Sequence, residues 1–185
     1  MINRFYINIK LLSFLKNLIS AKRTDIFKTI SHYYNKKQFL FFSMGRIALY
    51  NVLKNEIRTK KKEVLISPLT LPVIIDIIYY AGGKPVFIDL NINTGLPSLN
   101  ELNKKISSET SILFITHLYS NKKELKNISK FKKRNKIKII EDMAINFGLK
   151  NKNKFTNLDA DYSFFSFNYM KNFSTINGGM VHTKN

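Results

Sequence analysis

Two stretches, Lys136-Ile-Lys-Ile-Ile-Glu-Asp142 and Asp161-Tyr-Ser-Phe-Phe-Ser-Phe167, decide the fold of this chain. Each contains a short apolar run of the kind that forms a strand buried on both faces of a parallel sheet. An acid ends the first stretch, and the second leads through Asn-Tyr-Met into Lys171. Because ligands of such sheets bind beyond the carboxyl ends of the strands, the residues that follow both runs are candidates for a functional site.

Strands and helices alternate outward from these two stretches. Strands are predicted at Phe39–Phe42, Glu63–Ile66, Pro85–Asp89, Ser111–Thr116 and Gly179–Thr183. Helices are predicted at Ile47–Ile57, Leu71–Tyr80 and Lys122–Arg134, and another begins at Ser98, where Glu101 completes a capping box. The β-branched run within 71–80 also allows a strand. The alternation predicts a three-layer α/β/α fold with a mostly parallel sheet.

The residues after the two stretches fit the needs of a pyridoxal phosphate (PLP) site. The amine of Lys171 can form a Schiff base with the cofactor's aldehyde, and Asp142 can pair with the pyridinium nitrogen. The hydroxyl of Ser166 can bind the phosphate. Gly45 and Arg46 open a predicted helix, whose free backbone N–H groups also suit a phosphate. We therefore expect a PLP site built on Lys171.

Three further residues, Thr70, Leu71 and His117, stand at the ends of other predicted strands. The carboxyl ends of parallel strands lie at one edge of a sheet, so we expect these residues to converge on the same crevice. By composition alone, Leu71 is an ordinary core residue. A histidine such as His117 more often packs and forms hydrogen bonds than catalyses, so we expect a packing role for it.

The bulk composition limits the class of protein. A chain of 185 residues with 44% apolar content fits one globular domain. It has no cysteine, and its three histidines show no metal-ligand spacing, so we expect no metal. The net charge of +19 comes mainly from lysines spread along the chain, whereas arginine, which gives bidentate readout, is scarce. We interpret the charge as a solvated surface and expect no nucleic-acid partner.

Residues 1–37 are interpreted as an N-terminal helical arm. Lys10 and Lys16 interrupt its apolar run, which is too short and too broken to span a membrane. No clean signal-peptide cleavage site follows. An amphipathic helix that packs on its own domain or on a partner subunit fits the pattern, and a helix lying on a membrane surface is the alternative. We expect a cytoplasmic protein without an integral membrane segment.

Seven short motifs, in order along the chain, resemble those of the DegT/DnrJ/StrS sugar aminotransferases, which are PLP enzymes of fold type I. They lie at Met44–Leu49, Thr70–Leu71, Ala81–Asp89, Thr116–Tyr119, Ile140–Ala144, Phe165–Asn172 and Gly178–Val181. The resemblance implies that Lys171 is the Schiff-base lysine and that Asp142 pairs with the pyridine nitrogen. It also implies phosphate contacts at the turn that holds Gly45, and a ring contact at Leu71, where the family often has an aromatic residue.

The resemblance further implies transamination, in which an amino donor, usually glutamate, supplies the amino group for a keto-sugar that is typically nucleotide-linked. Lys171 would move the proton as general acid and base. Surface polysaccharide synthesis and a homodimer of the full-length protein are implied in the same way. Family members are longer than this chain, so residues 38–185 would correspond to a partial large domain, without its C-terminal part and the small domain.

Four departures from the family pattern keep other functions open. Arg46 replaces a small hydroxyl residue, Leu71 replaces the ring-stacking side chain, and Asn177 replaces an acid. Ile145 stands where a glutamine often reaches the cofactor's phenolic oxygen, and it cannot form that hydrogen bond. The alternatives are another fold type I enzyme acting on amino acids, an inactive or regulatory homologue, and a charge-driven binder of nucleic acid or membrane.

Overall fold

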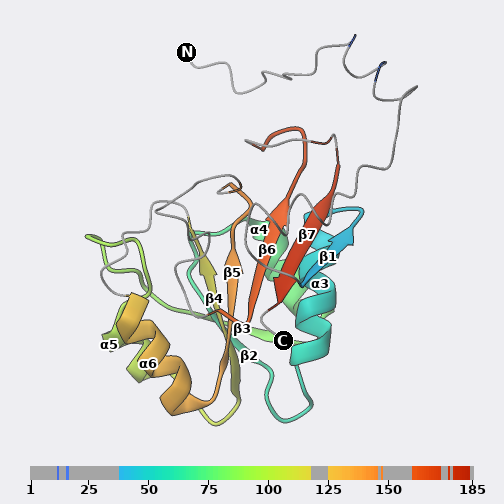
Figure 1. The fold of residues 1–185 in the computed structure, drawn as a ribbon. Helices are drawn as coiled ribbons and strands as arrows, with labels where there is room; N and C mark the ends of the chain where they lie inside the picture. Colours follow the sequence, from blue (N-terminus) through green and yellow to red (C-terminus); the bar gives the residue numbers. More distant parts are fainter. Residues whose placement is uncertain are drawn as a thin grey trace.

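The computed structural model describes Leu12, Lys16 and residues 38–117, 125–145, 147, 160–171, 175 and 177–183. Figure 1 shows these residues as a sheet with helices on both sides. The arm predicted for residues 1–37 lies outside the described residues, apart from Leu12 and Lys16. The same is true of Tyr119 and Asn172, which end two of the motifs quoted above.

One mixed sheet forms the centre of the fold. Its strands are β1 (Phe39–Phe42), β2 (Glu63–Ile66), β3 (Lys84–Phe87), β4 (Thr110–Thr116), β5 (Lys138–Asp142), β6 (Tyr162–Ser166) and β7 (Gly179–Thr183). Their spatial order is β1-β7-β6-β5-β4-β2-β3. All neighbours from β6 to β3 pair in parallel, and β7 is antiparallel to both β6 and β1. The sheet is therefore mostly parallel, as the sequence predicted.

Two pairs of helices cover the two faces of the sheet. They are α3 (Gly45–Glu56) and α4 (Pro72–Tyr80) on one face, and α5 (Leu99–Lys105) and α6 (Leu125–Asn135) on the other. Successive strand residues point to opposite faces, so Phe114 packs under α3 and α4 while Leu113 packs under α5 and α6. This arrangement confirms the three-layer α/β/α fold and decides that 72–80 is helical.

Several element boundaries differ from the sequence prediction: β3 is shifted to Lys84–Phe87, and α6 is described only from Leu125. Helix α3 begins at Gly45, two residues before the predicted start at Ile47. Strand β5 begins at Lys138 because Lys136 has a positive φ of 52°, which strand geometry does not allow. The capping box at Ser98 was wrong in its hydrogen bond: Ser98 is the N-cap residue, but its side chain makes no capping bond.

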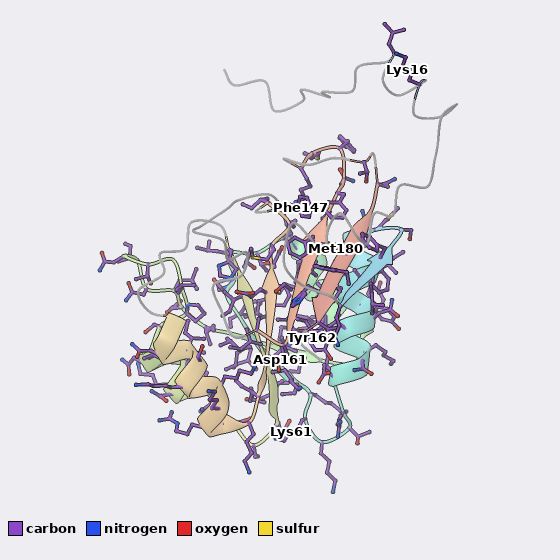
Figure 2. The ribbon with its side chains drawn as sticks, in the orientation of Figure 1. Lys16, Lys61, Phe147, Asp161, Tyr162 and Met180 are labelled. Carbon is purple, nitrogen blue, oxygen red and sulfur yellow. The ribbon has the colours of Figure 1, made fainter. Side chains whose placement is uncertain are left out.

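Polar side chains tie the amino-terminal edge of the sheet together. The carboxylate of Asp161 accepts a hydrogen bond from the backbone N–H of Ile139 at 2.8 Å, and it forms an ion pair with Lys132 at 2.8 Å. The hydroxyl of Tyr162 donates to Glu56 at 2.6 Å, which joins β6 to the end of α3. Figure 2 shows Asp161 and Tyr162 near one end of β6, with Met180 nearer the opposite edge. These ties lie at the edge of the sheet opposite to the candidate site residues.

The carboxyl edge is where the loops with candidate site residues begin. Strands β2, β3, β4, β5 and β6 all end there, as does β1, which runs parallel to β6 on the far side of β7. Above the aromatic end of β6, Phe147 packs edge-on against Phe165 and Phe167. Among the described helices, none is long and apolar enough to cross a membrane.

Candidate cofactor site

A cavity of about 560 Å³ opens at the carboxyl edge of the sheet. Its lining comes from the loops after β2, β3, β4, β5 and β6: Pro68, Leu69, Thr70, Leu71, Leu90, Gly95, Thr116, His117, Asp142, Ala144, Ile145 and Lys171. The structure thus brings together Leu71, Asp142 and Lys171 of the predicted site residues. Gly45, Arg46 and Ser166 are not among the lining residues.

Asp142 is the buried acid of this cavity, with 6% of its surface exposed. One carboxylate oxygen accepts the backbone N–H of Ala144 at 2.9 Å. Burial raises the pKa of Asp142 to about 6, against the lowering effect of the Ala144 hydrogen bond and of the positive charges of Lys171 and His117. An acid at this position gains free energy from any cationic group that enters the cavity beside it.

Lys171 reaches the same cavity from the turn that follows β6. Its backbone N–H donates to the carbonyl of Asn168 at 2.9 Å, and the Asn168 side chain accepts the N–H of Met170 at 3.2 Å. This turn reverses the chain after Phe167 and half-buries Lys171. Lys171 thus lines the same cavity as the buried carboxylate of Asp142.

The amino end of α3 is pressed against the ends of β6 and β7. A Cβ on Gly45 would lie 2.8 Å from the Cβ of Ser166, and one on Gly179 would lie 2.5 Å from the backbone of Met44 and Gly45. Met44 is the N-cap residue and makes no side-chain hydrogen bond to the helix, so the first N–H groups of α3 have no cap from it. The exposed Arg46 follows in the first turn. An uncapped helix end with a nearby cation suits an anion.

Two hydroxyls and several apolar side chains also line the cavity. The Thr70 and Thr116 hydroxyls lie 3.2 Å apart and link the ends of β2 and β4. Leu71 is 56% exposed, so its side chain is available to cover a flat ligand from one side. Ile145 lines the cavity as an apolar surface without hydrogen-bonding capacity in its side chain.

Sequence reasoning missed the polar contacts that support this cavity. His117 Nε2 lies 2.9 Å from Glu141, the fully buried neighbour of Asp142. An acid inside the apolar run Ile139-Ile-Glu-Asp142 was the available signal, because a buried acid needs partners. Nothing in the sequence indicated two other polar contacts of the cavity, the hydroxyl of Thr116 beside Thr70 and the backbone N–H of Ala144 bound to Asp142.

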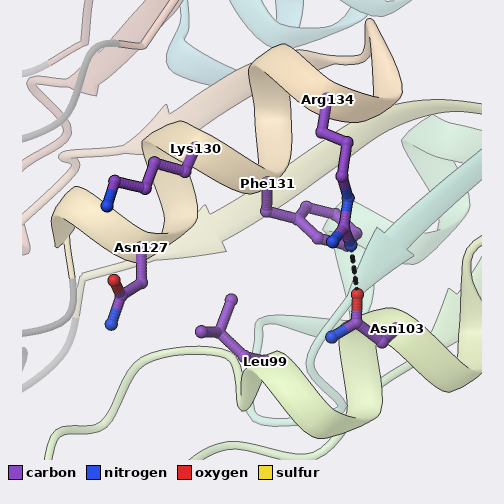
Figure 3. Close-up of a pocket in the computed structure, with 6 residues that line it drawn as sticks. All are labelled: Leu99, Asn103, Asn127, Lys130, Phe131 and Arg134. Carbon is purple, nitrogen blue, oxygen red and sulfur yellow. Dashed lines mark hydrogen bonds between the residues drawn. The ribbon is translucent and has the colours of Figure 1, made fainter.

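A smaller cavity of about 200 Å³ lies between α5 and α6, on the outer face of the molecule. Figure 3 shows Phe131 of α6 beside the side chain of Arg134, Leu99 on the α5 side, and Arg134 donating to Asn103. The guanidinium of Arg134 also lies 5.7 Å from the Phe131 ring centroid. Because its lining holds a lysine, Lys130, but no acid to pair with a basic ring nitrogen, we place the candidate site at the larger cavity.

The larger cavity therefore offers a specific set of chemical groups. A buried carboxylate can hold a basic ring nitrogen in its protonated form, and a nearby amine can react with an aldehyde. The glycines at positions 45 and 179 let the amino end of α3 approach the ends of β6 and β7 closely, beside Ser166. A flat aromatic aldehyde with a ring nitrogen has a partner in this cavity for its aldehyde and for its nitrogen, whereas the candidate phosphate contacts at Gly45, Arg46 and Ser166 lie outside the cavity's lining.

Solved structures identify the class of this fold. The structure of NtdA from Bacillus subtilis, described as carrying bound cofactor PMP, superimposes with a TM-score of 0.83 at 24% sequence identity. The match covers 98% of this chain and 43% of that chain. Since the identity is low, this likeness concerns the fold, which is that of the large domain of PLP-dependent aminotransferases.

The sequence gives the family directly. Residues 15–185 match the DegT/DnrJ/EryC1/StrS aminotransferase family, and the chain belongs to it. GDP-perosamine synthase from Escherichia coli O157:H7 is 33% identical over 141 residues, which are 76% of this chain and 39% of the relative. 3-Oxo-glucose-6-phosphate:glutamate aminotransferase from Bacillus subtilis is 26% identical over 159 residues, 85% of this chain and 35% of the relative. The chain thus spans well under half the length of these curated relatives.

Proposed function

We propose that this chain forms the cofactor-binding part of a PLP-dependent sugar aminotransferase. The reaction would move an amino group from an amino acid, with glutamate as the donor, to a keto-sugar that is linked to a nucleotide. The observation that carries the proposal is that Asp142 and Lys171 line one cavity at the carboxyl edge of the sheet. Family membership over residues 15–185 supports the same reaction class.

When bound, PLP supplies an aldehyde that reacts with amines and a protonated ring that withdraws electrons from the reacting carbon. Asp142 would hold the ring nitrogen by a charge-assisted hydrogen bond and keep it protonated. Lys171 would hold the cofactor through its Nζ and, once released by the donor, move the proton that leaves the donor's Cα. Both roles need the two side chains in one cavity, and Asp142 and Lys171 line the same cavity.

The remaining predicted contacts belong to the cofactor's ring and phosphate. Leu71 would cover one face of the ring by van der Waals contact, which its exposed position allows. The first N–H groups of α3 at Gly45 and Arg46, together with the Ser166 hydroxyl, would bind the phosphate. Support comes from the close packing of Gly45 against Ser166, which puts these groups side by side.

Relatives support the substrate class. The name GDP-perosamine synthase refers to a nucleotide-linked sugar, and the Bacillus subtilis relative is named for a keto-sugar phosphate and for glutamate. On that ground we propose glutamate as the amino donor and a keto-sugar as the acceptor. Of the possible acceptors, we favour a nucleotide-linked keto-sugar. A role in surface polysaccharide synthesis in the cytoplasm follows from that substrate class.

The test is replacement of Lys171 by alanine. We expect the wild-type protein to take up PLP with an absorbance band of the lysine-bound cofactor, and Lys171→Ala to lack that band. Lys104→Ala, which removes an exposed lysine of α5 paired with Glu101, is the matched control and should keep the band. An unchanged spectrum in Lys171→Ala would remove Lys171 from the site.

Substrate turnover separates this function from its alternatives. Conversion of the bound cofactor by glutamate, reversed by a nucleotide-linked keto-sugar, is the expected result. Conversion by amino acids with no response to any keto-sugar would indicate a different fold type I enzyme. Wild-type protein that takes up no PLP would indicate an inactive or regulatory homologue.

The proposal includes a homodimer. Leu69 and Leu71 are 63% and 56% exposed beside the cavity mouth, an apolar rim that a second subunit would cover. Light scattering at several protein concentrations gives the mass in solution, and a monomer at all concentrations would contradict this part of the proposal.

A further inference from the structure

Glu141 is a fully buried carboxylate that the reaction outlined above does not use. It has no exposed surface, and each of its oxygens has a partner. Oε1 lies 2.9 Å from His117 Nε2, and Oε2 accepts the hydroxyl of Ser163 at 3.0 Å. His117 and Ser163 are themselves buried, so water does not compensate the charge of Glu141. Among the described residues, neither lysine nor arginine contacts this carboxylate.

The position of Glu141 follows from the sheet register. Glu141 pairs with Ile115 of β4 on one side and with Ser163 of β6 on the other, and Ser163 pairs in turn with His182 of β7. His182 is buried and packs its ring against Phe39. The carboxylate thus lies in a row of cross-strand neighbours, with one histidine at the cavity and another two strands away.

Burying an unpaired carboxylate costs several kcal/mol, so this one is retained only because donors satisfy it. An ionised carboxylate can only accept hydrogen bonds, and Nε2 of His117 must therefore carry a proton when it faces Glu141. That contact fixes both the tautomer and the plane of the His117 ring, since Glu141 is held from its other side by Ser163.

His117 connects this pair to the candidate site. Its backbone N–H donates to the carbonyl of Asp142 at 3.2 Å, and its side chain lines the same cavity as Asp142 and Lys171. Glu141 and Asp142 are adjacent on β5 and point to opposite faces of the sheet. His117 therefore spans the strand end and touches Asp142 through its backbone and Glu141 through its side chain.

We propose that Glu141 is a positioning residue, which holds His117 with its Nε2 protonated and its ring fixed in the wall of the cavity that Asp142 and Lys171 line. This inference rests on the proposed function of the cavity. Removing the charge of Glu141 would weaken the contact that fixes the ring of His117 in the cavity wall.

The test compares Glu141→Gln with Ser163→Ala. The first keeps a hydrogen-bond acceptor beside His117 and removes the charge, whereas the second removes the other hydrogen bond and keeps the charge. The first readout is ¹⁵N NMR of His117 in cofactor-free protein at pH 8, assigned with a His117→Asn variant. We expect an Nε2-protonated ring in the wild type and in Ser163→Ala, and a mixture of tautomers in Glu141→Gln.

The second readout is the dissociation constant of PLP, measured from its absorbance on titration. We expect Glu141→Gln to raise this constant about tenfold, the size of one charge-assisted hydrogen bond, and Ser163→Ala to raise it less than about twofold. Glu141→Asp, which keeps the charge, should recover part of the loss.

The outcomes separate the inference from the proposed function. If wild-type protein binds no PLP, the proposed function fails, while the His117 signal still tests the Glu141 contact. If PLP binds but Glu141→Gln leaves both the His117 signal and the dissociation constant unchanged, the positioning role is wrong. If Glu141→Gln does not fold, the wild-type spectrum alone decides, because a His117 ring without a proton on Nε2 overturns the inference.

Discussion

Asp142 lies almost fully buried at the end of β5, and burial raises the pKa of its carboxyl to about 6. The unfolded chain binds this proton less tightly, with the ordinary value of 3.8. Stability from this group is therefore fully present below pH 3.8 and is lost as the pH rises through 6. Since one pKa unit corresponds to about 1.4 kcal/mol, ionised Asp142 costs the cofactor-free protein about 3 kcal/mol.

Replacing Asp142 by asparagine should therefore stabilise the cofactor-free protein while weakening PLP binding. We expect the free energy of unfolding to rise by about 3 kcal/mol at pH 8 and by much less at pH 4, where the wild-type acid is protonated. Urea unfolding at the two pH values measures the difference. This residue would then trade stability for cofactor binding, as functional sites often do.

Asp161→Asn is the matched control for that experiment. Asp161 accepts a backbone N–H and two lysine contacts at the opposite edge of the sheet, so its replacement should destabilise the protein at pH 8. A destabilised Asp142→Asn at pH 8 would mean that contacts of the carboxylate outweigh the cost of its burial.

At the scale of elements, the site depends on how closely α3 approaches the strands. Gly179 begins β7, and its missing side chain leaves room for the backbone of Met44 and Gly45. Gly45 in turn packs against Ser166 at the end of β6. The two glycines therefore set the distance between the amino end of α3 and the ends of β6 and β7.

Gly179→Ala should push the amino end of α3 away from β6 and β7. A Cβ there meets backbone atoms at 2.5 Å, so we expect destabilisation of about 1–3 kcal/mol together with weaker binding of the cofactor's phosphate. Thermal unfolding and a titration with PLP measure the two effects.

Gly82→Ala separates stability from binding in this experiment. A Cβ on Gly82 meets nothing within 4 Å, and only its positive φ of 91° opposes the change, at about 1 kcal/mol. It should lower stability without changing PLP affinity. Equal PLP affinity in Gly179→Ala and wild type would show that the close approach serves packing alone.

The elements themselves were largely predictable, and the exceptions have physical causes. Strands β1, β2 and β7 have the predicted limits because short apolar runs bounded by turn residues mark them clearly. The segment 72–80 could have been a strand, and its packing against α3 and the sheet decides for a helix. Ser98 lacks its capping hydrogen bond, which local sequence does not specify.

At the scale of the whole molecule, the sheet topology brings together site residues that are far apart in the sequence. Alternating strands and helices predicted one sheet edge for Leu71, Asp142 and Lys171, and the three line one cavity. The contact of His117 with Glu141 could not be predicted, because it depends on the register of β4 against β5. Gly45 and Ser166 were predicted for the same crevice but contact each other outside that cavity's lining.

The charge of the chain gives a prediction for the molecule as a whole. A net charge of +19 on 185 residues destabilises the folded state through self-repulsion, and salt screens it over about 10 Å at 0.1 M. We expect the melting temperature to rise from 20 to 300 mM NaCl. The exposed run Lys60-Lys61-Lys62 offers the control, since replacing it by glutamine should raise the melting temperature at low salt and flatten the dependence. A melting temperature that falls with added salt would instead mean that attractive ion pairs, such as Asp161 with Lys132, dominate the electrostatics.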